Sequence, residues 1–494
     1  MNRPNIVYIM SDDHAANAVS CYGSRLASVF RTPNMDRIAG EGVRLTNFFA
    51  TNSICTPARA TIMTGQYGHV NGVRTLADKW CPEAGPNLAL LLQQSGYETA
   101  LIGKWHLHCE PAGFDEYKYM CNCHEQGTYQ EPVFAEKGKG EVQYEGYVTD
   151  IITDMALTWL RGRKGSSKPF FLMFHHKAPH DFWEYPERHE HLFDGVEIPW
   201  PDSLFEDKSH RSEASRDFGS SVTPRSKIRS LYADFCRPDY VTGPLTGTEN
   251  MSFEEKGIAA YQKYLKDYLR TVAGIDDAIG AVFAELEAQG VLDDTIIIYT
   301  SDQGMFLGEH DYQDKRWSYE ESLMAPFLVR YPRDIEAGLV TDDLMDNTDI
   351  APTLLDYAGV DIPEAMQGLS QRRMLAGDVG AQKRDAVYFR YWMHLAHKHH
   401  NPAHYGIRTD RWKLIFYYGL PLDAAGAVDE QTPAGWELYD MESDPFELKN
   451  LYSDPQYADV IKELRARLDE LKTEYGDTDE QYPELVEVRK GCEE

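Results

Sequence analysis

The chain has 494 residues, of which 42% are hydrophobic and 26% charged, so it can bury a large core and a second domain. Its formal net charge of -30 repels nucleic acid and anionic membranes, which argues against both as partners. No apolar run reaches the roughly 18 residues that a membrane-spanning helix needs. The same charge repels an anionic substrate, so a site for one must create its own positive potential.

The first predicted element is a strand at Asn5–Met10. A strand this close to Met1 leaves no room for a basic leader, an apolar segment and a cleavage site. We therefore expect a cytoplasmic protein, unless a leader has been removed. The eight cysteines are then expected to be free thiols. Cys121 and Cys123 lack a second pair at zinc spacing, which favours plain thiols in a loop.

Further strands alternate with helices along the chain. Strands are predicted at Thr99–Ile102, Phe170–Phe174 and Thr295–Thr300, and helices at Asn87–Ser95 and from the capping box at Ser252–Glu255 to Gln289. This alternation predicts an α/β fold with a mostly parallel sheet sandwiched by helices. Each strand runs into polar residues, and ligands of such sheets bind beyond the carboxyl ends of the strands. Four polar clusters, far apart in sequence, should therefore converge in space.

The later part of the chain changes in pattern. Residues 201–252 are polar and irregular, which predicts an insertion or lid over the site. Ala386–Tyr391 and Tyr405–Tyr418 predict a hairpin-rich antiparallel sheet, and Tyr457–Tyr475 predicts an amphipathic helix. We predict a catalytic domain at residues 1–370 and a smaller C-terminal α+β domain at residues 371–494. The charged C-terminal helix is a candidate contact in a homo-oligomer.

The sharpest motif is Cys55-Thr56-Pro57-Ala58-Arg59. Pro57 predicts the first turn of a helix, so Cys55 would face the amide-rich end of that helix. Arg59 lies four residues further along, on the same helical face, where its charge would stabilise an anion at position 55. Five residues alone do not exclude a buried thiol beside a surface arginine.

This motif resembles the Cys-x-Pro-x-Arg maturation motif of the sulfatase family, within the alkaline-phosphatase-like superfamily. Other segments resemble the family's motifs in the family's own order: Pro4–Val7 with Asp12-Asp13, Gly103–His106, Pro179-His180, Ser301–Gly304, Asp314-Lys315 and Tyr439-Asp440 with Asp444-Pro445. Each segment is weak alone, but the ordered set is specific and covers nearly the whole chain. The resemblance implies an alkaline-phosphatase-like α/β fold.

The resemblance also implies how the nucleophile arises. A formylglycine-generating maturation enzyme would oxidise Cys55 to an aldehyde, formylglycine, whose hydrate is a geminal diol. One hydroxyl would attack sulfur, and loss of the other hydroxyl's proton would expel sulfate and restore the aldehyde.

A metal site follows from the same resemblance. Asp12, Asp13 and Asp302 offer hard oxygen atoms, Gln303 an amide oxygen, and position 55 a hydroxyl. These ligands suit one calcium ion, with magnesium or manganese as alternatives, and do not suit zinc. Many relatives carry asparagine or histidine where this chain has Gln303, whose oxygen lies one methylene further out than that of asparagine.

Four more residues complete the site that the resemblance implies. Lys104 would orient the nucleophile and the sulfate oxygens, and His106 would act as the base of diol breakdown. His180 and Lys315 would grip the sulfate near the leaving oxygen, with His180 as the acid. Together with Arg59 and the metal, these residues would supply the positive potential that the overall charge denies.

Two weaker signals adjoin these motifs. His394, His397, His399, His400 and His404 crowd one segment, which could be a second metal site, a pocket wall or a solvated loop. Because Pro402 lies among them, we favour a loop that reaches over the active site. Asp181, Phe182 and Trp183 follow His180 and could line the pocket or pack in the core.

The function that these residues predict is hydrolysis of sulfate monoesters. The stretch from Ser301 to Ser322 is similar to bacterial carbohydrate sulfatases, so a small or oligomeric sulfated sugar, such as a 6-sulfated hexosamine, is the expected substrate, with aryl sulfates also hydrolysed. A phosphodiesterase or phosphonate monoester hydrolase of the same superfamily remains an alternative. A non-catalytic protein that binds sulfated glycans is a third interpretation, against which the complete set of site residues argues.

Overall fold

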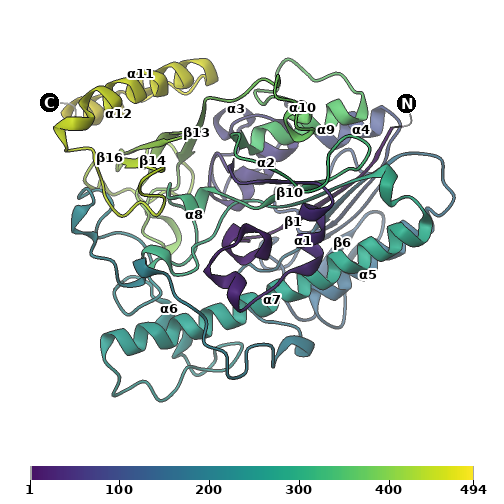
Figure 1. The fold of residues 1–494 in the computed structure, drawn as a ribbon, viewed down its shortest axis with the longest axis horizontal. Coiled ribbons are helices and arrows are strands. Elements are labelled where there is room, and N and C mark those ends of the chain that lie inside the picture. Colours follow the sequence, from purple (N-terminus) through teal and green to yellow (C-terminus); the bar gives the residue numbers. More distant parts are fainter. Residues whose placement is uncertain (1–2, 493–494) are drawn as a thin grey trace.

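A ten-stranded sheet runs through the centre of the computed structural model, which describes residues 3–492 (Figure 1). In spatial order the strands are β11 (Leu339–Thr341), β2 (Val43–Leu45), β10 (Phe327–Arg330), β9 (Thr295–Ser301), β1 (Asn5–Ser11), β8 (Phe170–His175), β4 (Glu98–Gly103), β5 (Glu116–Met120), β6 (Val133–Glu136) and β7 (Gly140–Gln143). The central strands from β9 to β5 are parallel, whereas β10, β6 and β7 pair antiparallel with their neighbours. The predicted α/β fold is confirmed, and its parallel part is the centre that carries the four polar clusters.

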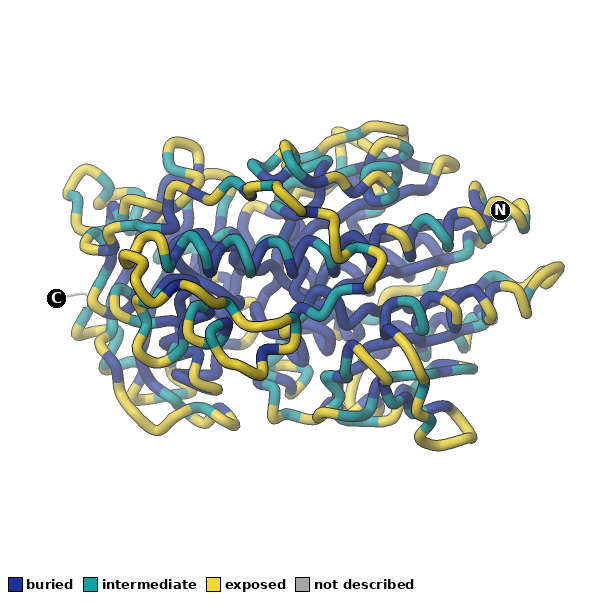
Figure 2. The backbone as a smooth tube through the Cα atoms, turned by 90° about the horizontal axis from the view of Figure 1, so that it is seen from below, coloured by how far each residue is buried: buried dark blue, intermediate teal, exposed yellow. Residues whose placement is uncertain are grey.

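Helices cover both faces of this sheet. α1 (Pro33–Gly40), α5 (Val148–Gly162) and α7 (Phe253–Gln289) lie on one face, and α2 (Cys55–Thr64), α4 (Leu88–Gln94) and α9 (Ile350–Ala358) on the other (Figure 1). Successive side chains of a strand point to opposite faces. Val7 and Ile9 of β1 therefore pack in the first layer, and Ile6, Tyr8 and Met10 in the second. Figure 2 shows buried backbone through the middle of the molecule and exposed loops around it.

The long helix α7 begins and ends where the sequence predicts. Ser252 Oγ accepts a hydrogen bond from the Glu255 amide at 3.2 Å, and the Glu255 carboxylate accepts one from the Ser252 amide at 2.7 Å. These two bonds form the predicted capping box. Gly290 ends the helix with a φ of 70°, which glycine adopts without a steric penalty. The buried side of α7 packs in the same hydrophobic layer as Val7 and Ile9 of β1.

A four-stranded antiparallel sheet follows in the C-terminal part, as predicted. It consists of β13 (Ala386–Tyr391), β14 (His404–Thr409), β15 (Trp412–Tyr417) and β16 (Gly435–Asp440). α11 (Ala458–Tyr475) packs on one of its faces, where α12 (Pro483–Gly491) also lies. The other face packs against residues 306–323, which follow β9 in the chain. The small sheet therefore contacts the segment that leads away from the central sheet. The boundary at residue 370 stays a prediction.

The remaining elements are short. They include β3 (Phe48–Phe49) paired with β12 (Met345–Asp346), and the helices α3 (Gly68–Asn71), α6 (Leu231–Phe235), α8 (Glu320–Leu323) and α10 (Arg372–Leu375). Residues 201–252 contain α6 and two single-turn helices, and their role as an insertion or lid stays a prediction. The seven cysteines from Cys21 to Cys236 are free thiols, as expected. Among residues 3–492, no helix is both long and apolar enough to cross a membrane.

Candidate active site

The polar clusters that follow the central strands meet at one edge of the sheet. Ser11, the last residue of β1, lies in register with Ser301, the last residue of β9. His175 ends β8 and is in register with Met10 of β1 and Gly103 of β4. The residues just beyond these ends therefore emerge side by side: Asp12 and Asp13, Asp302 and Gln303, Lys104 and His106, and His180. The structure brings the four clusters together as predicted, and their chemical roles stay predictions.

Three buried carboxylates form the floor of this edge. Asp12, Asp13 and Asp302 each offer one oxygen, and these oxygens lie within 4.8 Å of one another. Tyr268 of α7 fixes the backbone here, because its hydroxyl donates to the Asp13 carbonyl at 2.8 Å and accepts from the Ala15 amide at 2.9 Å. Buried carboxylates this close together repel one another unless a cation lies among them.

The amide of Gln303 completes an all-oxygen donor set. Its Nε2 donates to the Asp13 carboxylate, and its Oε1 is buried without a hydrogen-bond partner among residues 3–492. An amide oxygen without a partner is costly in a buried site, and a cation would satisfy it. Three carboxylates and one amide suit calcium, and magnesium less well, because both bind oxygen and calcium accepts irregular geometry. The residues present therefore fit one divalent cation.

Cys55 is buried beside this donor set. It is the first residue of α2, which confirms the helix start predicted from Pro57. Its Sγ lies 3.3 Å from Asp12 Oδ1 and 3.8 Å from Gln303 Nε2. Burial raises the pKa of the Cys55 thiol to about 12, although the Lys315 ammonium opposes this shift. An unmodified Cys55 is therefore protonated at neutral pH and a weak nucleophile.

Arg59 of α2 contacts residues that follow three of the central strands. Its Nε donates to Asp302 Oδ2 and its Nη1 to the Lys104 carbonyl, both at 3.0 Å. Its Nη2 also lies 3.9 Å from Asp12 Oδ2. The guanidinium is buried, so the alternative of a surface arginine is excluded. Arg59 therefore places a positive charge, held by these contacts, on the same helix as Cys55.

Two lysines also reach this edge of the sheet. Lys104 Nζ pairs with Asp12, and Lys315 Nζ lies 2.5 Å from Asp13 Oδ2. Although burial opposes it, the Asp13 carboxylate raises the pKa of Lys315 above its ordinary value, so this ammonium stays charged. Burial lowers the pKa of Lys104 well below its ordinary value, and the Lys177 ammonium adds to this shift. The Arg59 guanidinium and the Lys315 ammonium therefore supply the positive charge at this edge, and a divalent cation would add to it. The local potential that an anionic substrate requires is thus available in a protein of net charge -30.

His180 faces the carboxylates with a fixed ring. Its Nδ1 lies 2.7 Å from Asp181 Oδ1, and its Nε2 lies 3.7 Å from Asp13 Oδ2. A carboxylate at Nδ1 orients the ring and leaves Nε2 to act toward the site. Burial lowers the pKa of His180, and the Lys315 and Lys104 ammonium groups lower it further.

His106 reaches the site by a different route from the one predicted. Its φ is 57°, so the expected extended course from Lys104 to His106 is wrong. The two side chains nevertheless converge on Gln126, which accepts from Lys104 Nζ at 2.6 Å and whose Nε2 lies 3.5 Å from His106 Nε2. Gln126 is a site residue that sequence reasoning missed, because only its position in the folded loop near Cys123 brings it there.

A cavity of about 710 Å³ opens onto His106, His180 and Lys315. Several of its lining residues were not predicted as site residues: Gln126, Arg229, Asp314 and Arg316. Arg229 comes from the 201–252 segment and reaches Asp181 at 3.3 Å. The sequence signal for Asp314 and Arg316 was their position on either side of Lys315. Arg229 carried no signal, because nothing in its neighbourhood shows which part of the insertion faces the cavity.

The histidine-rich segment divides into two parts. His397 and His399 line the cavity, and His399 Nδ1 lies 3.0 Å from Asp314 Oδ2. His394 and His404 are instead buried within the C-terminal part. The favoured interpretation of a loop at the active site thus agrees with the positions of His397 and His399 only. Among the residues after His180, Asp181 and Phe182 line the cavity, whereas Trp183 is buried against Tyr264 in the core.

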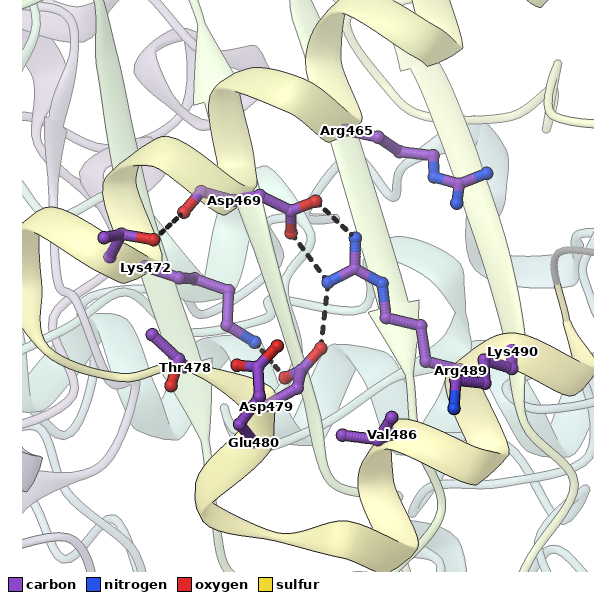
Figure 3. A pocket seen from close by; sticks show the side chains of 10 residues that line it. Arg465, Asp469, Lys472, Thr478, Asp479, Glu480, Val486, Arg489 and Lys490 are labelled. Atoms are coloured by element: carbon purple, nitrogen blue, oxygen red, sulfur yellow. Dashed lines mark hydrogen bonds and ion pairs between the residues drawn. The ribbon is translucent and has the colours of Figure 1, made fainter.

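A second cavity, of about 330 Å³, lies between α11 and α12, far along the chain from the strand ends (Figure 3). Four of its charged residues are paired with one another: Asp479 accepts from Lys472 and from Arg489, and Arg489 also pairs with Asp469. None of the predicted site residues lines it. Its ion pairs join the two C-terminal helices, so we interpret it as structural.

Comparison with protein families matches two models to this chain. The sulfatase model matches residues 4–360, and the model for the C-terminal part of N-sulphoglucosamine sulphohydrolase matches residues 308–474. The first of these spans the strand ends, Cys55 and Lys315. The second includes Lys315, the histidine-rich segment and the small sheet.

Individual proteins are similar over nearly the whole chain. An N-acetylglucosamine-6-O-sulfatase of Bacteroides thetaiotaomicron is 40% identical over 98% of this chain and 89% of its own length. A structure solved in complex with its substrate D-glucosamine-2-N,6-O-disulfate has a TM-score of 0.85 and 39% identity, covering 97% of this chain and 100% of that one. A phosphonate monoester hydrolase from Silicibacter pomeroyi, at 20% identity, a TM-score of 0.72 and 96% coverage of both chains, shares the fold alone.

Proposed function

Because this chain belongs to the sulfatase family, we propose that it hydrolyses sulfate esters of sugars through a formylglycine made from Cys55 and one divalent cation, calcium. The observation that carries this proposal is the single buried cluster of Asp12, Asp13 and Asp302 with Cys55 beside it. Both candidate metal groups among residues 3–492 contain Asp12, so they describe one place. Two-metal phosphatases need a second ligand set, because their two ions stabilise the attacking and the leaving oxygens.

Asp12, Asp13, Asp302 and Gln303 would hold the cation, which would neutralise charge that develops on the sulfate oxygens. Hydrated formylglycine would supply a hydroxyl nucleophile, and its second hydroxyl would allow sulfate to be expelled again as the aldehyde re-forms. A serine has no second hydroxyl and cannot release sulfate in this way. The thiol of Cys55 must be oxidised for this purpose by a separate maturation enzyme.

The residues of the chain itself then bind and orient the substrate. Lys104 pairs with Asp12 and Lys315 pairs with Asp13. The two side chains would hold the sulfate oxygens between them. His106 would remove a proton from the hydrated nucleophile, with Gln126 positioning its ring. His180 would donate a proton to the leaving sugar oxygen, and the sulfate's own charge would favour its protonated form.

The substrate is proposed from the relatives. The N-acetylglucosamine-6-O-sulfatase and the complex with D-glucosamine-2-N,6-O-disulfate both point to a 6-O-sulfated glucosamine. The cavity of about 710 Å³ has room for a sugar ring, and Asp181, Arg229 and Asp314 offer polar atoms at its wall. We therefore propose a 6-sulfated hexosamine as the group bound there.

The alternative of a phosphodiesterase or phosphonate monoester hydrolase is tested with matched substrates. Matured protein should hydrolyse 4-nitrophenyl sulfate faster than bis(4-nitrophenyl) phosphate, which has the same leaving group and the same charge. N-acetylglucosamine 6-O-sulfate should be hydrolysed faster than the 3-O-sulfate. A phosphodiester rate that exceeds the sulfate rate by orders of magnitude would overturn the sulfatase proposal. Tight binding of sulfated glycans without any turnover would favour the non-catalytic interpretation instead.

The role of His180 gives a prediction that depends on the leaving group. His180→Ala should slow hydrolysis of N-acetylglucosamine 6-O-sulfate about 100- to 10,000-fold, because a sugar alkoxide needs a proton to leave. The same change should slow 4-nitrophenyl sulfate less than about tenfold, because nitrophenolate leaves without one. His189→Ala, which pairs with Asp277 outside the site, is the control and should change neither rate. Equal losses on both substrates would contradict an acid role for His180.

A further inference from the structure

A second groove continues from the active-site cavity across the molecular surface. It has a volume of about 370 Å³, and three residues line both spaces: Phe182, Arg229 and His397. Lys227 and Lys398 line only the second space, which we call the outer groove. One side of the outer groove belongs to the 201–252 segment and the other to the histidine-rich loop. A chain-like ligand held in the cavity could therefore extend into this groove without leaving the surface.

The charge of the outer groove is opposite to that of the protein. Its lining includes the side chains of Lys227, Arg229, Arg237 and Lys398, against the single carboxylate of Asp234. Arg229 pairs with Asp234, so the excess positive charge remains. In a protein of net charge -30, such a concentration of cations at the mouth of the site favours an anionic ligand.

The two lysines are exposed and have no carboxylate partner. Among residues 3–492, no ion pair involves Lys227 or Lys398, although the chain has 79 acidic residues. Arg237 differs, because it pairs with Asp239 at 3.2 Å. The ammonium groups of Lys227 and Lys398 are therefore available to a ligand without breaking an existing pair.

The outer groove also has an apolar component that suits a sugar. Phe182 is 38% exposed and Ile228 is 52% exposed, and both line the same groove as the cations. Apolar side chains that lie exposed among polar ones mark ligand grooves, and a pyranose ring presents C–H groups on its faces. Cations beside apolar side chains match a sugar that carries anionic substituents.

We propose that Lys227 and Lys398 bind an anionic group on the sugar next to the one whose sulfate is hydrolysed. The substrate is then an oligosaccharide with several sulfates rather than a monosaccharide. This inference rests on the proposed sulfatase function, since it names the substrate class of the same site. The two lysines contribute to selection of the substrate and take no part in the reaction.

The test uses three sulfated substrates with matured protein. They are N-acetylglucosamine 6-O-sulfate, chitotetraose with one terminal 6-O-sulfate, and chitotetraose with a 6-O-sulfate on every sugar. For removal of the terminal sulfate, kcat/KM should be about tenfold higher on the fully sulfated tetrasaccharide than on the singly sulfated one, the gain that two exposed charge pairs can give. This gain should shrink as salt concentration rises.

Variants assign the gain to the outer groove. The double variant Lys227→Ala/Lys398→Ala should lose most of the gain and keep its kcat/KM on the monosaccharide. The control Lys164→Ala/Lys168→Ala removes the same charge from an exposed loop between α5 and β8, at the opposite edge of the sheet, and should keep the gain. Equal kcat/KM on both tetrasaccharides in the unaltered protein, or a full gain in the groove variant, would overturn the proposal.

Calorimetry separates this proposal from the proposed function. Cys55→Ala protein cannot form the nucleophile, yet it should bind the fully sulfated tetrasaccharide more tightly than the singly sulfated one. Adding the two lysine changes should abolish that difference in Kd. If matured protein has no sulfatase activity but this difference in Kd persists, the proposed function fails and the groove remains a polyanion site. If activity is present and the difference is absent, the groove proposal alone fails.

Discussion

Cys55→Ala is expected to lower kcat on sulfate esters at least about 10,000-fold, because it removes the side chain proposed to become the nucleophile. Cys55 begins α2, and its Sγ contacts both Asp12 and Gln303, two of the proposed metal ligands. The loss should appear in kcat with little change in substrate Kd, because Lys104 and Lys315 remain to bind sulfate. Single-turnover kinetics and calorimetry measure these two quantities separately.

The matched control is Cys236→Ala. Cys236 is also a free thiol, but it follows α6 and its Sγ contacts Thr248, outside the site. This variant should keep full activity. Substantial turnover by Cys55→Ala protein, freed of any unaltered enzyme, would contradict the assignment of the nucleophile.

Asp302→Asn is expected to remove the divalent cation and to lower kcat/KM about a thousandfold, a loss of about 4 kcal/mol of transition-state stabilisation. Asp302 does more than offer a ligand atom. Its Oδ1 accepts from the backbone amides of Asp13 and Gln303, and its Oδ2 pairs with Arg59 at 2.9 Å. An asparagine keeps the shape but not the charge, so the metal content of folded protein should fall toward zero from the one divalent cation per chain that the proposed function predicts.

Stability must be followed in the same variant. Arg59 is buried, and losing its partner is expected to cost about 3 to 5 kcal/mol of the free energy of unfolding. Asp479→Asn is a matched control, because Asp479 is also a buried carboxylate that pairs with two cations, Lys472 and Arg489, but far from the site. It should lose stability and keep both metal and activity. Full metal content and activity in Asp302→Asn protein would contradict the metal site.

Much of the fold could be predicted from local patterns. Asn5–Met10 and Thr295–Thr300 are apolar runs that end at polar residues, and both became strands of the parallel centre. The capping box at Ser252 and the glycine at 290 set the ends of α7 to the residue, because both signals act on the backbone locally. From parallel strands alone, the sequence also predicted that Asp12 and Asp302 would lie together.

What could not be predicted depends on contacts between distant segments. Gln126 and Arg229 lie in irregular segments whose course is set by packing, so no period in the sequence places them in the cavity. The spacing from Lys104 to His106 predicted an extended segment, but the left-handed backbone at His106 arises where the chain leaves β4. The histidine-rich segment divided into cavity-lining and core residues for the same reason, since the small sheet fixes His404 while the loop carries His397 outward.

The most direct test of the account is the mass of the peptide that contains Cys55, measured together with sulfatase activity on the same batch. Protein co-expressed with a maturation enzyme should show a loss of about 18 Da at Cys55, the change from a thiol to an aldehyde, and activity should rise in proportion to the modified fraction. Fully active protein that retains an unmodified Cys55 would contradict the account.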